Sequence, residues 1–140
     1  METINITEPP RIQNPRLAEI HREADAVQLF LNEESNIQDP ASLTGRLQAM
    51  DVYMARISEL VSLSRAMKEY ALNLYLEENE DKLAKLSATV SNRMIKSFLY
   101  EFNVTVDRLD TMYSAMVHLS RNLVTQISFI KQQMQSLHYQ

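Results

Sequence analysis

The 140-residue chain contains a single glycine, Gly45, and this scarcity limits the folds that it can adopt. Average usage would place about ten glycines in a chain of this length. Tight β-hairpins need residues at positive φ, which glycine supplies most readily, so a sheet of several strands would lack its turns. A sequence with one glycine also contains no glycine-rich phosphate loop and no dinucleotide-binding fingerprint. The deficit therefore predicts an all-α fold and excludes most nucleotide-dependent enzymes that use such loops.

The remaining composition fits one folded domain preceded by an arm. The apolar fraction of 45% and the charged fraction of 23% are ordinary for globular proteins, and the absence of cysteine excludes disulfides, thiol catalysis and cysteine-ligated zinc. No signal peptide and no apolar stretch long enough to span a membrane is found, so we expect a cytoplasmic protein without membrane association. Pro9-Pro10 and the lack of an apolar period predict a flexible arm over residues 1–14, with one helical domain over 15–140.

Two similar start signals open the first two predicted helices. Asn14-Pro15 and Asp39-Pro40 each place a capping side chain directly before a proline in the first turn. Apolar residues then recur at spacings of three and four, which is the period of a helix that buries one face. These patterns predict helices over 15–34 and 40–77.

A helix break and a third helix are expected next. Carboxylates are unfavourable near a helix C-terminus, so the acidic knot of Glu77, Glu78, Glu80 and Asp81 indicates a break around 78–82. A shorter helix is predicted over 84–101, with Ser87 or Ser91 as alternative caps. The β-branched patch Val104-Thr105-Val106 is interpreted as a junction between helices.

The last predicted helix, 104–138, has the most regular apolar pattern. Its seam alternates spacings of three and four over four heptads, as in a coiled coil, and would be roughly 50 Å long. Only the 40–77 helix could match that length, which predicts either a long helical hairpin or a bundle of about four helices. The seam consists of Val106, Leu109, Tyr113, Met116, Ser120, Leu123, Ile127, Ile130, Met134 and Leu137.

Part of this helix is expected to remain uncovered within one chain and to support self-association. Large apolar surfaces left over on long helices are usually buried by a second copy. Met112 and Leu119, in the row beside the seam, are the residues expected to stay uncovered. The candidate oligomer interface comprises Met112, Met116, Leu119, Leu123, Ile127, Ile130 and Met134.

A basic run offers nucleic acid as an alternative partner. Lys82, Lys85, Arg93 and Lys96 would share one helical stripe, and no acid lies between Lys82 and Tyr100. Such a stripe can follow a phosphate backbone. However, no aromatic residue interleaves the four charges for base stacking, and the acidic knot is adjacent. A solvated helix face is therefore the simpler interpretation.

Catalytic and metal-binding patterns find no support in the sequence. His118 has no carboxylate one helical turn away to orient it, so a catalytic triad is not indicated. No His-x-x-x-His or Glu-x-x-His spacing occurs, and we expect neither a metal nor a cofactor. His118 and Arg121 remain candidates for contacting a small anion where two subunits meet.

Seven residues of the last helix carry a resemblance: His118, Asn122, Leu123, Thr125, Ile127, Ser128 and Lys131. With them the helix resembles the C-terminal helix of a group of small uncharacterised helical proteins encoded by bacteriophages and integrated mobile elements. Arg121 and Val124 depart from that group, in which an acid and an arginine commonly stand at these two positions. The resemblance implies a phage or mobile-element setting and an all-helical fold, and it implies no activity.

These observations together favour a non-enzymatic helical interaction protein. We expect a homo-oligomer that binds an unidentified protein partner as an accessory or inhibitory factor. The alternatives are a nucleic-acid-associated protein that uses the basic run and a binder of small anions at a subunit interface.

Overall fold

A computed structural model describes residues 11–33 and 39–138, and within these ranges every regular element is a helix. The helices are α1 (Pro15–Asn32), α2 (Pro40–Glu78), α3 (Glu80–Ala84), α4 (Ala88–Phe98) and α5 (Tyr100–His138). The all-α fold predicted from the glycine deficit is confirmed. The predicted arm falls largely on residues 1–10, which lie outside the described residues, but Ile12 at its end packs against the core.

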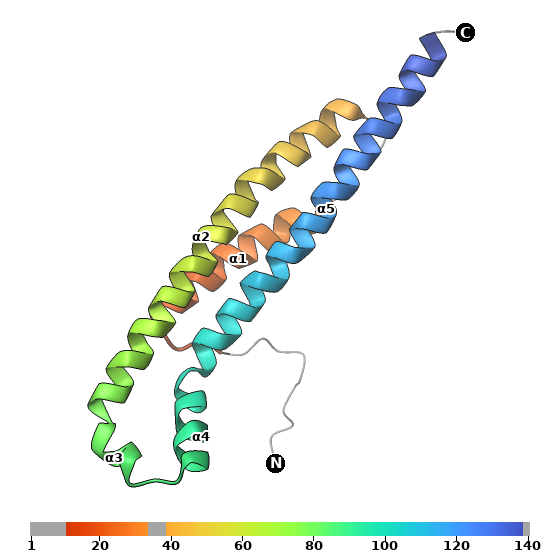
Figure 1. Ribbon diagram of the computed structural model, residues 1–140. Helices are drawn as coiled ribbons and strands as arrows, with labels where there is room; N and C mark the ends of the chain where they lie inside the picture. The colour runs from red at the N-terminus through yellow and green to blue at the C-terminus, as the bar shows by residue number, and fades with distance from the viewer. Residues whose placement is uncertain (1–10, 34–38, 139–140) are drawn as a thin grey trace, which may run out of the picture.

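The two long helices, α2 and α5, each contain 39 residues and run antiparallel, side by side, along the molecule (Figure 1). α3 and α4 connect them at one end, and α1 packs against both of them in the middle (Figure 1). At the other end α5 extends beyond the start of α2 (Figure 1). The arrangement matches the long helical hairpin with shorter helices alongside more closely than a compact four-helix bundle. We call residues 65–98 the distal end and residues 131–138 of α5 the tail.

The helix starts follow the capping chemistry expected from the sequence. The Asn14 side chain accepts hydrogen bonds from the backbone N–H groups of Arg16 and Leu17 at 3.0 and 3.3 Å, and the Asp39 carboxylate accepts one from Ala41 at 3.1 Å. These bonds satisfy backbone donors that have no partner in the first turn of a helix. Both predicted start signals, each with its proline, are therefore confirmed.

Helix breaks separate the third and fourth helices from their neighbours. α2 ends at Glu78, as the acidic knot predicted. Of the two candidate caps, Ser87 begins α4 because its Oγ accepts a hydrogen bond from the Val90 N–H at 3.3 Å. The Ser91 hydroxyl instead donates to the Leu83 carbonyl at 3.1 Å.

The junction expected at residues 104–106 was placed wrongly, because α5 already begins at Tyr100 and runs through this patch. Thr105 is fully buried against the other helices, and its hydroxyl donates to the Glu101 carbonyl of the preceding turn at 2.7 Å. β-Branched residues only weakly disfavour a helix, and burial overrides that preference. The chain bends at Leu99 instead, which caps the end of α4.

The core lies where α1, α2 and α5 meet, and most of it is aliphatic. α1 contributes the predicted stripe, with Leu17, Ile20, Ala24 and Val27 buried. α2 buries Leu43, Met50, Ile57, Leu60, Val61 and Ser64, and α5 buries Phe102, Thr105, Leu109, Met112, Met116, Leu123 and Ile127.

The distal end has no fully buried side chain, since every residue from 65 to 98 keeps partial or full exposure. Tyr75 of α2 stacks on Phe98 of α4 with ring centroids 4.3 Å apart, which joins these two helices. α1 does not extend over this end, because it begins beside the start of α5. There the Glu101 carboxylate accepts the backbone N–H groups of Gln13 and Asn14.

Candidate functional site

The C-terminal part of α5 continues a buried row of side chains beyond the end of its partner helix. Met116 and Leu123 are buried and lie one heptad apart, and Ile130 and Leu137 occupy the next two heptad positions. Ile130 is half-buried, whereas Met134 is 56% exposed and Leu137 is 73% exposed. The row passes from core to surface because the tail extends past the first residues of α2 (Figure 1). The tail therefore presents core-type positions that the described part of the chain leaves uncovered.

The seven residues predicted as an oligomer interface fall into two groups. The expectation that Met112 stays uncovered was wrong, because α1 packs on that side of α5: Met112 lines a hollow together with Gln28 and Leu31 of α1. Leu119, predicted with it, does remain exposed. Met112, Met116, Leu123 and Ile127 are buried within the chain, Ile130 is half-buried, and Leu119 and Met134 are exposed.

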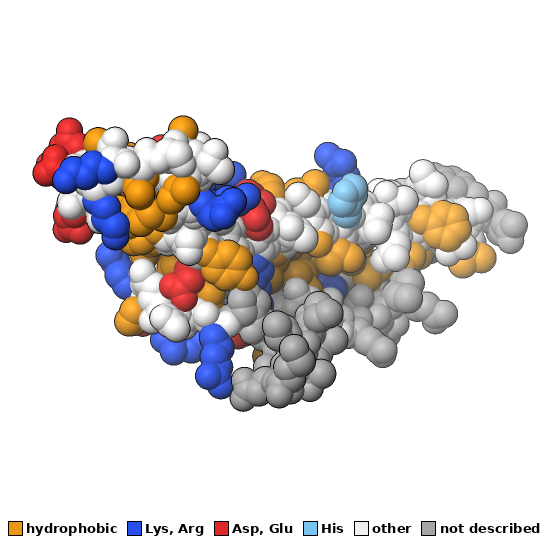
Figure 2. Space-filling view, turned by 90° about the horizontal axis from the view of Figure 1, so that it is seen from below, with side chains coloured by type: hydrophobic (Ala, Val, Ile, Leu, Met, Phe, Trp, Pro, Cys, Tyr) orange, Lys and Arg blue, Asp and Glu red, His pale blue; other side chains and the backbone are white. Residues whose placement is uncertain are grey.

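Carboxylate side chains are distributed unevenly along the chain. After Asp110 the sequence contains no carboxylate side chain, and Lys131 is an exposed cation on the tail. On the side of the molecule shown in Figure 2, acidic side chains lie at the distal end, among basic ones, and in the middle of the molecule, and none is visible along the tail at the right. The tail therefore offers an apolar surface with a positive charge beside it.

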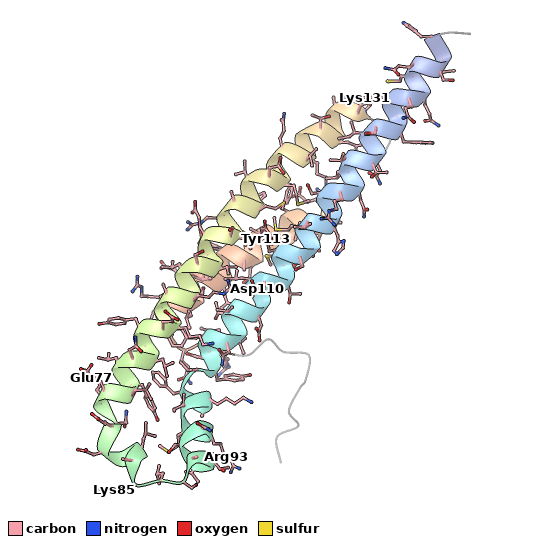
Figure 3. The ribbon with its side chains drawn as sticks, viewed as in Figure 1. Glu77, Lys85, Arg93, Asp110, Tyr113 and Lys131 are labelled. Carbon is pink, nitrogen blue, oxygen red and sulfur yellow. The ribbon has the colours of Figure 1, made fainter. Side chains whose placement is uncertain are left out.

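The four candidate phosphate contacts do not form the single stripe expected from the sequence. Lys82 lies in α3, Lys85 follows its end, and Arg93 and Lys96 lie in α4. The break at Leu86 and Ser87 separates the two pairs, so the helical spacing on which the stripe depended does not exist. All four side chains are exposed, and Figure 3 places Lys85 at the tip of the distal end and Arg93 on α4.

The two candidate anion contacts, His118 and Arg121, are both exposed on α5. No hydrogen bond or ion pair links either side chain to another residue in the described part of the chain.

A polar network that the sequence did not predict fastens α1 to α5. His21 contacts two α5 residues through its ring, with Nε2 2.9 Å from the Thr105 hydroxyl and Nδ1 2.9 Å from the Arg108 guanidinium. Arg108 also donates to the Asp25 carboxylate at 2.6 Å. These partners lie more than 80 residues apart, so no local spacing in the sequence indicates the contact.

The network fixes the protonation state of His21. The Thr105 hydroxyl already donates to the Glu101 carbonyl, so it accepts from the Nε2–H of His21, while Nδ1 accepts a hydrogen bond from Arg108. This is a neutral imidazole. Burial of the ring and then the neighbouring positive charge of Arg108 lower the pKa of His21, while Asp25 and Glu101 oppose the shift. The arrangement holds α1 against α5.

Open hollows flank α1 on both sides. One, of about 420 Å³, lies between α1 and α2, where Arg56 pairs with Glu23 at 2.9 Å and with Glu59 at 3.0 Å. The other, of about 460 Å³, lies between α1 and α5. Among the described residues no cluster of three or more histidines and carboxylates could hold a metal ion. None of the described helices is both long enough and apolar enough to cross a membrane.

Comparisons with known proteins found no matching family model, no similar curated protein and no similar solved structure.

Proposed function

We propose that the protein is a non-enzymatic helical interaction protein that self-associates through the tail of α5. In its assembled form it acts on an unidentified protein partner as an accessory or inhibitory factor. The setting implied by the resemblance of the last helix, a phage or mobile element, is part of the same proposal. Nucleic-acid binding has less support, because the four basic residues do not share one helix.

The observation that carries the proposal is the exposure of Met134 and Leu137 at positions that continue a buried row. α5 remains helical to His138, although its last eight residues are all exposed. Isolated helical turns are marginal in water, so a second surface that covers this row would stabilise the tail as well as bind it.

The energy available from the tail sets a limit on how it can be used. Complete burial of a Met or Leu side chain contributes roughly 1.5–3 kcal/mol, so two such residues from each of two chains contribute at most about 6–12 kcal/mol. Association costs roughly 4–15 kcal/mol in lost freedom. Contact between two tails alone would therefore be marginal, and a stable assembly needs further surface from each copy.

Sedimentation velocity at micromolar concentration tests the proposal with a matched pair of variants. Met134→Glu with Leu137→Glu places two carboxylates on the exposed row and should yield folded monomer. Gln132→Glu with Ser136→Glu adds the same charge on the opposite face of the tail and should leave the assembly as in wild type. Circular dichroism shows whether each variant keeps its helices. The proposal fails if the variant with Met134 and Leu137 replaced remains assembled.

A further inference from the structure

We propose that α1 is a pH-responsive cover on the pair of long helices, α2 and α5. Protonation of His21 weakens the attachment of α1 to α5, so that the N-terminal half of α1 lifts away while its C-terminal end stays on α2. This inference goes beyond the proposed function, because it concerns a different face of the molecule and does not depend on self-association.

One row of polar side chains on α5 attaches the N-terminal half of α1, which lies across the middle of α2 and α5 (Figure 1). The row has spacings of four and three and consists of Glu101, Thr105 and Arg108. The Glu101 carboxylate accepts the two backbone N–H groups directly before Pro15, and the other two side chains both contact His21. We call these three residues the clasp.

The C-terminal end of α1 is held by α2 instead. The Arg46 guanidinium donates to the backbone carbonyls of Phe30 and Leu31 at 3.3 and 3.2 Å, and its Cζ lies 4.8 Å from the centroid of the Phe30 ring. Tyr53 packs on the same ring, with the two ring centroids 4.6 Å apart. These contacts involve no histidine and no carboxylate, so protonation of His21 leaves them in place.

The clasp uses both ring nitrogens of a neutral His21. Its Nε2–H donates to the Thr105 hydroxyl, and its Nδ1 accepts from Arg108, each at 2.9 Å. A protonated imidazole carries a hydrogen on both nitrogens and can no longer accept. Protonation therefore replaces the hydrogen bond to Arg108 by two opposed donors that both carry positive charge.

Two carboxylates face the ring, Asp25 from α1 and Glu101 from α5, and both favour its charged form. Asp25 already accepts from Arg108 at 2.6 Å, and Glu101 accepts the N–H groups at the start of α1. Each would have to weaken an existing contact between α1 and α5 in order to bind the imidazolium. Burial of the ring and then the positive charge of Arg108 outweigh both carboxylates and lower the pKa of His21.

The linkage between protonation and opening gives the direction of the response. On the α2 side of α1, Arg56 pairs with Glu23 and Glu59, so these charges are matched among themselves. When the N-terminal half lifts, His21 regains its ordinary pKa of about 6.5 and binds a proton more readily than in the closed molecule. Opening is therefore favoured as the pH falls below about 6.5. Its equilibrium constant rises by up to about tenfold for each unit by which closure lowers the pKa.

The open form stays a minority of the molecules, because lifting uncovers apolar side chains. Leu17, Ile20 and Ala24 lie in this half of α1 and are buried in the closed molecule. A separated helical segment this short is marginal in water, so its backbone amides exchange with solvent while it is open. Hydrogen exchange detects such a small open fraction.

The test compares the exchange of individual amides, followed by NMR at pH 7.5 and pH 5.0 and corrected for the intrinsic pH dependence of exchange. We expect the protection of residues 18–25 to fall several-fold on acidification. Residues 28–32 of α1, 57–64 of α2 and 109–116 of α5 should change little.

Two matched variants assign the effect to one histidine. In His21→Gln the side-chain amide can still donate to Thr105 and accept from Arg108, yet it does not titrate, so the loss of protection at pH 5.0 should disappear. His118→Gln replaces an exposed histidine of α5 and should behave as wild type.

Several outcomes would overturn the proposal. An equal loss of protection in α1, α2 and α5 would mean that protonation destabilises the whole fold and lifts no cover. Unchanged protection of residues 18–25, or a loss that persists in His21→Gln, would remove His21 as the cause.

The wild-type protein alone supplies a further criterion if His21→Gln does not fold. The loss of protection should level off once the His21 imidazole, followed by NMR, is fully protonated, and a loss that continues to lower pH contradicts the proposal. Each of these results leaves the proposed self-association standing.

Discussion

Two leucines in equivalent heptad positions of α5 should respond in opposite ways to the same substitution. Leu109 is 1% exposed and lies in the core, whereas Leu137, four heptads later, is 73% exposed. Replacing a buried leucine by alanine costs about 2–5 kcal/mol, so Leu109→Ala should lower the free energy of unfolding by that amount. Since roughly 2–4 °C of melting temperature corresponds to 1 kcal/mol in a domain of this size, the midpoint should fall by roughly 4–20 °C.

The same change at Leu137 should leave folding of one chain almost unaffected. Full burial of a leucine side chain is worth roughly 1.5–3 kcal/mol, and this side chain has lost only about a quarter of its accessible surface, so Leu137→Ala should cost less than about 0.8 kcal/mol. It should weaken self-association instead. Urea denaturation followed by circular dichroism at low protein concentration measures the first effect, and sedimentation measures the second.

The pair of substitutions discriminates between two descriptions of α5. If Leu137→Ala destabilised the monomer as much as Leu109→Ala does, the tail would be packed within its own chain and would not be free to bind. If Leu109→Ala had almost no effect on unfolding, the packing of α5 against α2 would be wrong.

Two further predictions concern stability. Gly45 lies in the interior of α2 without a positive φ, and no packing neighbour lies within 4 Å of the place that a β-carbon would occupy. Gly45→Ala should therefore raise the free energy of unfolding by about 0.5–1 kcal/mol. A loss of stability in urea denaturation would contradict this. Because the folded pKa of His21 is lowered below its unfolded value of about 6.5, the unfolded chain binds more protons and stability should decrease as the pH falls from about 6.5 through the folded pKa. Urea denaturation across this pH range should show a smaller decrease in the free energy of unfolding for His21→Gln than for wild type. An equal decrease would show that His21 does not cause the pH dependence.

Local chemistry explains which parts of the fold could be predicted from the sequence. Asn14 and Asp39 cap helices through bonds to residues two or three positions away, so their sequence neighbours were sufficient. The buried stripe of α1 was also predictable, because it faces two helices with one side only. Its period of three and four survives unchanged from sequence to structure.

The errors occur where tertiary packing decides the outcome. Met112 is buried and Tyr113 is exposed because α1 lies on one side of α5 and turns its buried face toward Met112. The junction was misplaced because burial of Thr105 outweighs the weak helix preference of a β-branched residue. The contact between His21 and Arg108 joins residues 87 positions apart and depends on how α1 and α5 align, which no local pattern encodes.

The candidate surface was predicted in part. The heptad pattern correctly identified α5 as a helix with a continuous apolar row, but it could not show where the partner helix stops. That boundary depends on where α2 begins relative to α5, and it makes Met134 and Leu137 surface residues while Leu123 and Ile127 belong to the core.

The mass of the free wild-type protein in solution tests the central claim most directly. Sedimentation equilibrium over a range of micromolar concentrations should show a species with at least twice the 16.2 kDa mass of one chain, in reversible exchange with monomer. A single species of 16.2 kDa at every concentration would contradict the claim that the tail of α5 is a self-association surface.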